Sequence, residues 1–283
     1  LYASERDFAL EVIVVDNASS DDSLQMLREN YSDVVVIANR ENCGFAAANN
    51  QALAAARGRL LFLLNPDTEM DSGALSAMVH FLDQHETVGV VGPKLTGLDG
   101  RIQGGAAGYE PSLRTVFNHA VFLSRLNPRL FPGTWLAVQQ YRQSSPFSVD
   151  WVSGAALMVR KSVFEQVGGL DDTFFMYAED IDWCRRIREA GWEIHLLPNA
   201  NIMHYIGASA MQSETKSVDH YADSLDRYCR SQYRPGTAVL VQLIYALGFA
   251  IRAVIYGLLY LFKREPRDSQ SASLWWSSLV ATM

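Results

Sequence analysis

Polar side chains follow three short apolar runs near the start of the chain, at the point where each run ends. The runs are 10–15, 34–38 and 60–64, and each has the length and apolar character of a buried strand. Carboxylates and amides at such points can hydrogen-bond a polar ligand, and carboxylate oxygens also bind hard cations. The residues concerned are Asp16, Asn17, Asn42, Asn65 and Asp67.

A second group of acids lies far along the chain, beside an aromatic segment. Glu179, Asp180 and Asp182 fall in the first turn of an expected helix, directly after the mostly aromatic segment 174–177. Helix capping and the helix dipole explain many acids at such positions, and that explanation stays open here. Apolar surroundings, however, raise the basicity of a carboxylate, so this group is also a candidate general base.

The elements that must position these groups alternate between strand and helix. Helical patterns at 21–30, 46–57 and 72–85 follow the three strands, and a fourth strand is expected at 88–91. This order predicts an α/β fold with a mostly parallel sheet flanked by helices, in which ligands bind beyond the carboxyl ends of the strands. The pattern continues with a strand at 155–159, a helix from 179 to 191, and a strand at 192–197 that leads to His204.

Composition excludes several other classes of protein. The chain has 283 residues, 49% of them hydrophobic and 19% charged, which is unlike a disulfide scaffold or a disordered chain. Its net charge of −7 provides no basic excess for general nucleic-acid binding, so no nucleic-acid partner is expected. The three cysteines form no CxxC pair, which favours a reducing compartment and argues against a zinc site.

The carboxyl-terminal end differs from the rest of the sequence. Residues 238–262 are apolar apart from a few polar side chains, and the run is long enough to cross a bilayer. The polar side chains recur at steps of three, four or seven, on one face of a helix: Gln242, Tyr245, Arg252, Tyr256, Tyr260 and Lys263. This stripe favours a helix that lies in the membrane interface or packs against a partner, with a buried core helix as the alternative.

Six segments together resemble the inverting family 2 glycosyltransferases, in particular their bacterial rhamnosyltransferase-like branch. Between Glu11 and about Tyr233 the chain contains, in order, VIVVDNASSDDS, NRENCGFAAANN, LLNPDTE, WVSGAALMVRK, VGGLDDTFFMYAEDIDWCRR and HYIGAS. The resemblance implies a GT-A fold, a nucleotide-sugar donor such as a dTDP- or UDP-sugar, and a glycan or polyprenyl-linked acceptor. A dinucleotide-binding dehydrogenase would instead need GxGxxG after the first strand, where this chain has DNASSD.

The resemblance also implies a site for Mg²⁺ or Mn²⁺. The Asp-x-Asp motif of the family corresponds to Asn65-Pro66-Asp67, so Asp67 is the expected ligand and Asn65 is expected to contact the donor sugar or ribose. His204 is the expected second ligand from its place before Gly207-Ala208-Ser209. On the residues alone, a turn after a strand and a structural histidine also explain these positions.

The donor contacts implied by the resemblance come from two segments. Asp16 and Asn17 are expected to bind the nucleotide base and ribose, and a second group is formed by Asn42, Gly44 and Asn49. Glycine at position 44 would let the backbone approach the nucleotide. Arg40 is expected to meet the diphosphate, or else to be a plain surface charge.

The acidic pair of the family corresponds to Glu179-Asp180, and Asp180 is the expected general base. Inversion would follow from a single displacement, in which the acceptor hydroxyl attacks opposite the diphosphate while Asp180 accepts its proton. Trp151, Ser153 and Gly154 are expected to line the acceptor side, with Tyr177 and Glu179 adjacent.

These inferences predict an inverting glycosyltransferase that uses dTDP-rhamnose at the cytoplasmic face of the cell membrane. Residues 1–235 would form the catalytic domain, without the first strand that the family usually has, and 236–283 a membrane-associated helical tail, peripheral or anchoring. One alternative is a catalytically inactive, membrane-attached protein that binds nucleotide sugars or serves as a scaffold. Another is a lipid-modifying membrane protein unrelated to sugars, which only the apolar tail supports.

Overall fold

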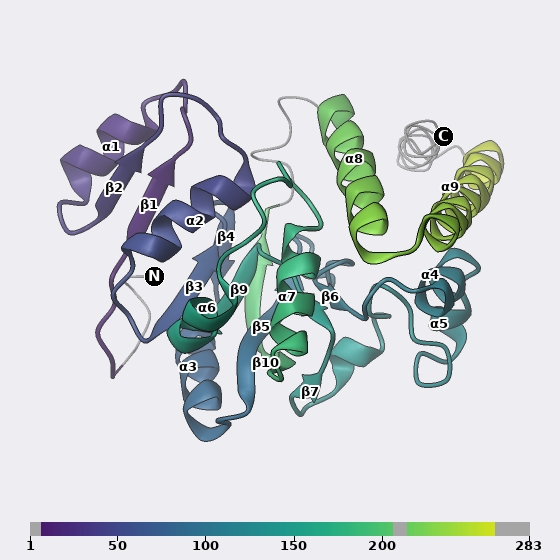
Figure 1. The fold of residues 1–283 in the computed structure, drawn as a ribbon, viewed down its shortest axis with the longest axis horizontal. Coiled ribbons are helices and arrows are strands. Elements are labelled where there is room, and N and C mark those ends of the chain that lie inside the picture. The colour runs from purple at the N-terminus through teal and green to yellow at the C-terminus, as the bar shows by residue number, and fades with distance from the viewer. Residues whose placement is uncertain (1–6, 206–213, 264–283) are drawn as a thin grey trace. The chain divides into compact units, whose positions relative to one another are not determined.

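The computed structural model describes residues 7–205 and 214–263, with the backbone alone at helical positions 214–219, 221–222 and 259–263 (Figure 1). The chain forms two compact units. Unit 1 comprises the residues up to 103 together with 143–205, and unit 2 comprises 104–142 together with the residues from 206 onwards.

Unit 1 begins with a small α/β layer. Strands β1 (Ile13–Asp16) and β2 (Val35–Ala38) pair in parallel, as expected for strands joined by a helix. That helix is α1 (Ser23–Asn30), and α2 (Phe45–Ala55) follows β2. The alanine-rich sequence of α2 suits a helix, and its small side chains let Ala46 and Ala48 pack closely in the core.

The main sheet of unit 1 has strand order β3-β9-β5-β10-β4, with β7 paired to β10. Strands β5 and β10 are parallel, whereas β9 lies antiparallel between β3 and β5, so β3, β5 and β10 run in the same direction. The α/β fold is confirmed, and the pairing is more mixed than the crossover pattern predicts. The strands are β3 (Leu60–Leu64), β4 (Thr68–Met70), β5 (Val88–Thr96), β7 (Phe147–Ser148), β9 (Ala156–Arg160) and β10 (Glu193–His204).

Three helices complete unit 1, together with the short strand β8 (Trp151–Val152). They are α3 (Ala74–Gln84), α6 (Lys161–Val167) and α7 (Glu179–Glu189), and α7 begins at the residue that the sequence predicts. β10 extends beyond its expected end and reaches His204, with a shift of pairing after Leu197 where Pro198 donates no hydrogen bond. The continued strand fixes the position of His204.

Unit 2 is largely helical. Helix α4 (Leu113–Ala120) starts with a capping box between Ser112 and Thr115, and it is followed by α5 (Leu123–Leu126), α8 (Glu214–Gln232) and α9 (Pro235–Lys263). Its other elements are β6 (Ala107–Gly108) and a 3-10 turn, η1 (Gln140–Arg142). The expected tail helix is thus present as α9. The boundary expected near residue 235 falls inside unit 2, because α9 shares a hydrophobic core with α4 and α8.

Candidate active site

The directions of the strands bring several expected site residues to one edge of the main sheet. Asn65 and Asp67 follow the carboxyl end of β3, and His204 ends β10, which runs in the same direction. β9 runs the opposite way, so Gly154, which precedes it, lies at this edge too. The sheet thus gathers residues that are separated by up to 139 positions in the sequence.

The side chains expected to bind a metal face each other at this edge. Asp67 Oδ1 lies 3.2 Å from His204 Nε2, and both side chains are largely buried. Asn65 Nδ2 lies 3.4 Å from the same nitrogen. Asp67 Oδ1 has no hydrogen-bond partner among the residues that the structure describes. A buried carboxylate oxygen that faces an imidazole nitrogen is suited to share a cation with it.

Gln103 contacts His204 of the metal pair, and the sequence did not predict this contact. Its Oε1 lies 3.1 Å from His204 Nδ1, on the opposite side of the ring from Asp67. When Nδ1 donates its hydrogen to this amide oxygen, Nε2 keeps its lone pair and faces Asp67 as a ligand would. Gln103 belongs to an irregular segment rich in glycine, where the sequence carries no signal for such a contact.

The residues present fit a divalent cation that takes further ligands from a bound molecule. Within 7–205 and 214–263, no group of three or more His, Cys, Asp or Glu side chains gathers around one point. Asp67 and His204 alone would leave most coordination positions of Mg²⁺ or Mn²⁺ open, and phosphate oxygens are suitable ligands for them.

The acidic pair has an asymmetric environment. Asp180 accepts hydrogen bonds from the backbone N–H of Gly154 to Oδ2, at 3.0 Å, and of Ile181 to Oδ1, at 2.8 Å. Glu179 is only 4% exposed, and its Oε2 finds no hydrogen-bond partner in the described part of the chain. The two carboxylates are therefore stabilised very differently.

These environments decide which acid carries the charge. Burial raises the pKa of Glu179 well above its ordinary value, and the neighbouring charge of Asp180 raises it further. Burial also raises the pKa of Asp180, but the N–H groups of Gly154 and Ile181 stabilise its charged form and oppose the shift. The backbone hydrogen bonds therefore favour the charged form of Asp180 over that of Glu179.

Asp182 has a different role from the other two acids. Its Oδ2 pairs with Arg186 Nε at 2.8 Å, and Arg186 also donates to the carbonyl of Gly169 at 2.8 Å. Ion pairing therefore explains Asp182. Just before the acidic pair, Tyr177 and Ala178 adopt left-handed backbone angles, with φ of 71° and 64°. Such angles cost non-glycine residues on the order of 1 kcal/mol or more, and they set the position of the acids that follow.

The expected donor segment is held together by one amide. Asn17 Oδ1 accepts from the backbone N–H of Cys43 and from Asn39 Nδ2, both at 3.1 Å. Asn17 Nδ2 donates to Asn42 Oδ1 at 2.9 Å and to the carbonyl of Gly44 at 3.2 Å. Asn17 therefore ties the end of β1 to the loop after β2, and Asn39 and Cys43 join the expected donor residues in this group.

The other expected donor residues occupy varied environments. Asp16 is buried at the end of β1, and Arg40 is exposed. Asn49 Nδ2 donates at 2.9 Å to the carbonyl of Phe45, one turn earlier in α2. Their contacts with a donor stay predictions, as do those of Asn17, Asn42 and Asn65.

Gly44 joins the donor loop to the aromatic segment before the acidic pair. Its φ is +87°, and a Cβ atom on it would lie only 2.7 Å from the carbonyl oxygen of Phe175. The next backbone N–H, that of Phe45, donates to this same oxygen at 2.8 Å. Only glycine allows this close approach without displacing one of the two segments.

Gly154 lies where the three groups meet. Its N–H binds Asp180, and a Cβ atom on it would lie 3.1 Å from the ring of Phe45 at the donor loop. The carbonyl of Ala155 accepts a 2.9 Å hydrogen bond from Asn65, beside the metal pair. The expected metal ligands, general base and donor loop are therefore neighbours. Trp151 is 3% exposed, so it offers little surface to an acceptor, and its expected role there stays a prediction.

Comparisons with known proteins identify the family of the chain. Residues 3–128 match the family model described as Glycosyl transferase family 2. N-acetylglucosaminyl-diphospho-decaprenol L-rhamnosyltransferase of Mycobacterium tuberculosis is 32% identical over 215 residues, which cover 72% of this chain and 68% of that protein. Rhamnosyltransferase WbbL of Escherichia coli is 38% identical over 80 residues, which cover 28% of this chain and 30% of that protein.

A solved structure shows the same fold. Mannosyltransferase PcManGT from Pyrobaculum calidifontis, in complex with GDP-Man and Mn²⁺, gives a TM-score of 0.57 at 16% identity, over 96% of this chain and 76% of that one. This likeness confirms the expected GT-A fold. The family match and the length of the mycobacterial alignment extend the agreement to sequence. The chain is a glycosyltransferase and belongs to glycosyl transferase family 2.

Proposed function

We propose that this chain is an inverting rhamnosyltransferase, which moves L-rhamnose from dTDP-rhamnose to a hydroxyl of a lipid-linked cell-envelope glycan. The observation that supports turnover best is that Asn65, which lies beside the pair Asp67–His204, and Asp180 both hydrogen-bond the short segment 154–155. A protein that only binds nucleotide sugars would not require a proton acceptor beside its diphosphate site.

The choice of sugar and acceptor draws on the related proteins. The mycobacterial relative is named for transfer of L-rhamnose to N-acetylglucosaminyl-diphospho-decaprenol, and the Escherichia coli relative is also a rhamnosyltransferase. We infer the same class of donor and a polyprenyl-diphosphate-linked acceptor for this chain.

Asp67 and His204 would hold Mg²⁺ or Mn²⁺ against the donor diphosphate, with Gln103 orienting the imidazole. When bound, such a cation neutralises the negative charge that develops on the departing nucleotide diphosphate. The loop organised by Asn17 would hold the nucleotide, and the open backbone at Gly44 would approach it closely.

Asp180 would carry out the proton transfer. The acceptor hydroxyl oxygen forms a bond to the anomeric carbon, the bond from that carbon to the diphosphate oxygen breaks, and the hydroxyl proton passes to the Asp180 carboxylate. Each carboxylate oxygen of Asp180 accepts one backbone hydrogen bond and keeps a further lone pair for this proton. Because attack and departure occur on opposite faces, one displacement inverts the configuration.

The proposed place of action is the cytoplasmic face of the cell membrane. A polyprenyl-linked acceptor stays in the bilayer, so the enzyme must work at its surface. The residues of α9 from Pro235 to Leu258 form one described helix that is long and apolar enough to associate with a membrane. All three cysteines are free thiols, in line with a reducing compartment.

The proposal is tested by supplying the purified full chain with a polyprenyl-diphosphate N-acetylglucosamine acceptor and a panel of donors. Release of the nucleotide diphosphate is measured for dTDP-rhamnose, UDP-hexoses and UDP-galactofuranose, with Mn²⁺ and with a chelator. We expect acceptor-dependent release of dTDP from dTDP-rhamnose, and loss of release with the chelator. NMR of the product should show the anomeric configuration inverted.

Three outcomes would contradict specific parts of this proposal. Turnover with a different donor, and none with dTDP-rhamnose, would show that the transferred sugar is not rhamnose. Full activity in the presence of the chelator would show that the reaction needs no divalent cation. Binding of every donor without turnover, with acceptor and Mn²⁺ present, would favour the inactive nucleotide-sugar-binding protein instead.

A further inference from the structure

Helix α9 is amphipathic in an unusual sense, because its apolar side is exposed. We call this side the outer face, and its members follow one another mainly at steps of three, four and seven, which places them along one side of the helix. Leu243 is 61% exposed and Val254 60% exposed, and a contiguous apolar patch is far less common than single exposed apolar side chains. The outer face comprises Val239, Leu240, Leu243, Leu247, Val254, Ile255 and Leu258.

The opposite side of α9 carries the polar stripe, and this side is packed within unit 2. Val241, Tyr245 and Phe249 share a buried cluster with Val116 of α4 and with α8. Gln242 donates a hydrogen bond to Asp226 of α8. Gln242 and Tyr245, two members of the stripe, therefore face neighbouring helices rather than water. Tyr260 and Lys263, the last members of the stripe, have side chains outside the described residues.

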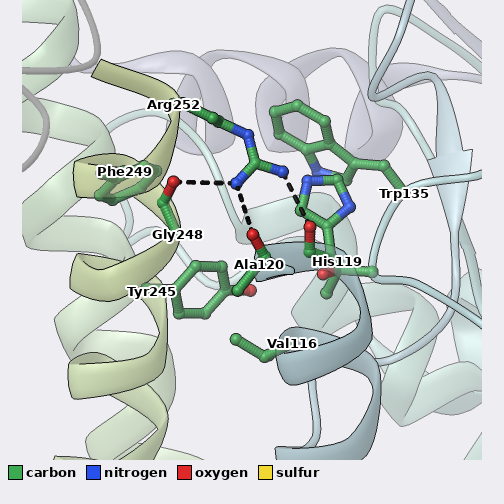
Figure 2. A pocket seen from close by; sticks show the side chains of 9 residues that line it. Val116, His119, Ala120, Trp135, Tyr245, Gly248, Phe249 and Arg252 are labelled. Carbon is green, nitrogen blue, oxygen red and sulfur yellow. Dashed lines mark hydrogen bonds between the residues drawn. The ribbon is translucent and has the colours of Figure 1, made fainter. Parts of the chain in front are cut away.

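Arg252 shows how strongly this inner side is fixed (Figure 2). Its guanidinium donates to the carbonyls of His119 and Ala120 at the end of α4, at 2.9 Å and 3.4 Å, and to that of Gly248 at 3.0 Å. It also lies over the ring of Phe122, 4.6 Å from the centroid. The last carbonyls of a helix lack partners within the helix and carry partial negative charge, so they suit an arginine.

The surroundings of Arg252 are arranged around one positive charge. His119 and Trp135 stack edge to face at 5.1 Å in the small pocket beside it. Burial and the charge of Arg252 lower the pKa of His119 to about 3, so this imidazole is neutral. The polar side chains of Gln242, Tyr245 and Arg252 thus contact unit 2, whereas the outer face consists of exposed apolar residues.

These contacts conflict with a helix that crosses the bilayer. Helix α8 packs along α9 and presents Asp226 and Arg230, which form an exposed ion pair. If α9 crossed the membrane with these contacts intact, the charges of α8 would enter the hydrocarbon region, where ionised side chains are costly. A helix in the plane of the interface avoids this cost, since only its outer face enters the lipid.

The charge of unit 2 indicates which lipids it meets. Residues 104–142 and 206–283 contain twelve Lys and Arg against seven Asp and Glu, whereas the rest of the chain contains twelve against twenty-four. The basic excess thus belongs to the unit that carries the exposed apolar face. Anionic headgroups attract such an excess, and the acidic unit 1 would be repelled.

We propose that α9 lies in the plane of an anionic bilayer, with its outer face among the acyl chains and its polar side held on α4 and α8. The helix is then a peripheral attachment rather than a span. This attachment would bring the enzyme to the bilayer that holds its polyprenyl-linked acceptor. It rests on the proposed function only in taking the acceptor to be lipid-linked. Its test measures binding alone, so its failure and a failure of turnover are distinguishable.

The test uses the full chain and vesicles of phosphatidylcholine with or without phosphatidylglycerol, separated by sedimentation. Leu243→Gln with Leu247→Gln should weaken binding to the anionic vesicles about a hundredfold, since each buried leucine contributes at least about tenfold. The matched control combines Leu98→Gln and Met26→Gln, which change two exposed apolar residues of unit 1. It should bind as the unchanged chain does, and circular dichroism should show both variants folded.

Further outcomes decide between the occupants of the outer face. Membranes from cells that make the full chain should release it into alkaline carbonate, and a requirement for detergent would overturn the proposal in favour of a span. Equal binding to vesicles without phosphatidylglycerol would overturn the role of charge. If the chain is a dimer in light scattering, and the leucine variant is a monomer that binds vesicles normally, a second copy covers the face and the proposal fails.

Discussion

Two regions of the molecule bury ionisable side chains, and they stabilise them in opposite ways. In unit 2, Arg252 is surrounded by carbonyl oxygens and an aromatic ring. In unit 1, Glu179 is equally buried, yet one of its carboxyl oxygens has no hydrogen-bond partner among the described residues. An arginine cannot give up its charge within proteins, whereas a carboxylate can bind a proton and become neutral.

This difference separates a structural charge from a chemical one. The guanidinium of Arg252 donates to the last carbonyls of α4 and to a carbonyl of α9, and these hydrogen bonds hold the two helices together. At the acidic pair, the N–H groups of Gly154 and Ile181 stabilise one charged carboxylate, Asp180, next to a neutral neighbour. We therefore expect a proton to move at the second region and not at the first. The following substitutions test that distinction.

The largest effect is expected at Asp180. Asp180→Asn removes the proton acceptor and keeps a side chain of nearly the same shape, so turnover should fall about 10²- to 10⁴-fold. The matched control is Asp172→Asn, an exposed acid in the preceding loop, which should keep turnover within about twofold. Nucleotide diphosphate release at saturating donor and Mn²⁺ measures both. Normal turnover in Asp180→Asn would place the base elsewhere.

The next effect concerns stability rather than turnover. Arg252→Met keeps much of the length of the side chain but leaves the carbonyls at the end of α4 without their donor, so we expect a loss of about 2–4 kcal/mol in the free energy of unfolding. Arg125 lies over the same Phe122 ring, 4.9 Å from the centroid, but it is exposed. Arg125→Met should therefore cost no more than about 1 kcal/mol.

Urea unfolding of the two arginine variants provides the measurement. If both lose the same amount, the ring contact dominates and the carbonyl contacts contribute little. If neither loses stability, the packing of α9 on α4 does not depend on the buried charge, and the contrast between the two regions fails.

Much of unit 1 follows from local sequence pattern. The strands at 60–64 and 88–91 and the helix from Glu179 have clear apolar periods and clear ends, and the structure has them there. The positions of Asp67 and Asp180 at the ends of such elements made them candidates, whereas the roles expected for Asp67, His204 and Asp180 came from the family resemblance. Asn39 directly follows β2, just as Asn17 directly follows β1. A search for polar residues at strand ends would therefore also have selected Asn39 for the donor loop.

Contacts that depend on distant segments could not be predicted in this way. Gln103 reaches His204 across 101 positions, and nothing in its own neighbourhood marks it. The antiparallel insertion of β9 between β3 and β5 is likewise set by pairing partners rather than by its own residues. For α9, the spacing of polar and apolar residues predicts a polar face and an apolar face. Only the packing of α9 on α4 shows that the polar face is the buried one.

A third effect extends the contrast to the metal pair, where a neutral side chain fixes a ligand. Gln103→Leu removes the acceptor for His204 Nδ1 and lets the ring rotate, so the affinity for Mn²⁺ should fall about 10- to 100-fold. Titration of turnover with Mn²⁺ measures this, and excess Mn²⁺ should restore the maximal rate. The matched control is Arg101→Gln, which changes an exposed side chain close to Gln103 in the sequence. Asn201→Leu would not serve as a control, because Asn201 donates a hydrogen bond to Asp71. An unchanged Mn²⁺ titration in Gln103→Leu would remove the positioning role.

The smallest effect tests the neutral member of the acidic pair. Because the pKa of Glu179 is higher in the folded chain than in the unfolded one, the folded state binds this proton more tightly, and stability is lost as pH rises through the folded pKa. Glu179→Gln stays neutral at every pH, so it should unfold with about 1 kcal/mol more stability than the unchanged chain at pH 8, and the gap should close toward pH 4.

Activity completes the argument about Glu179. If it serves as the neutral neighbour of Asp180, Glu179→Gln should keep turnover within about tenfold, since the amide also carries no charge beside the base. Urea unfolding across this pH range and diphosphate release on the same samples give both quantities. A gap that widens toward low pH would show that Glu179 is charged in the folded chain. A loss of turnover as large as that of Asp180→Asn would mean that the proton acceptor is the pair rather than Asp180 alone.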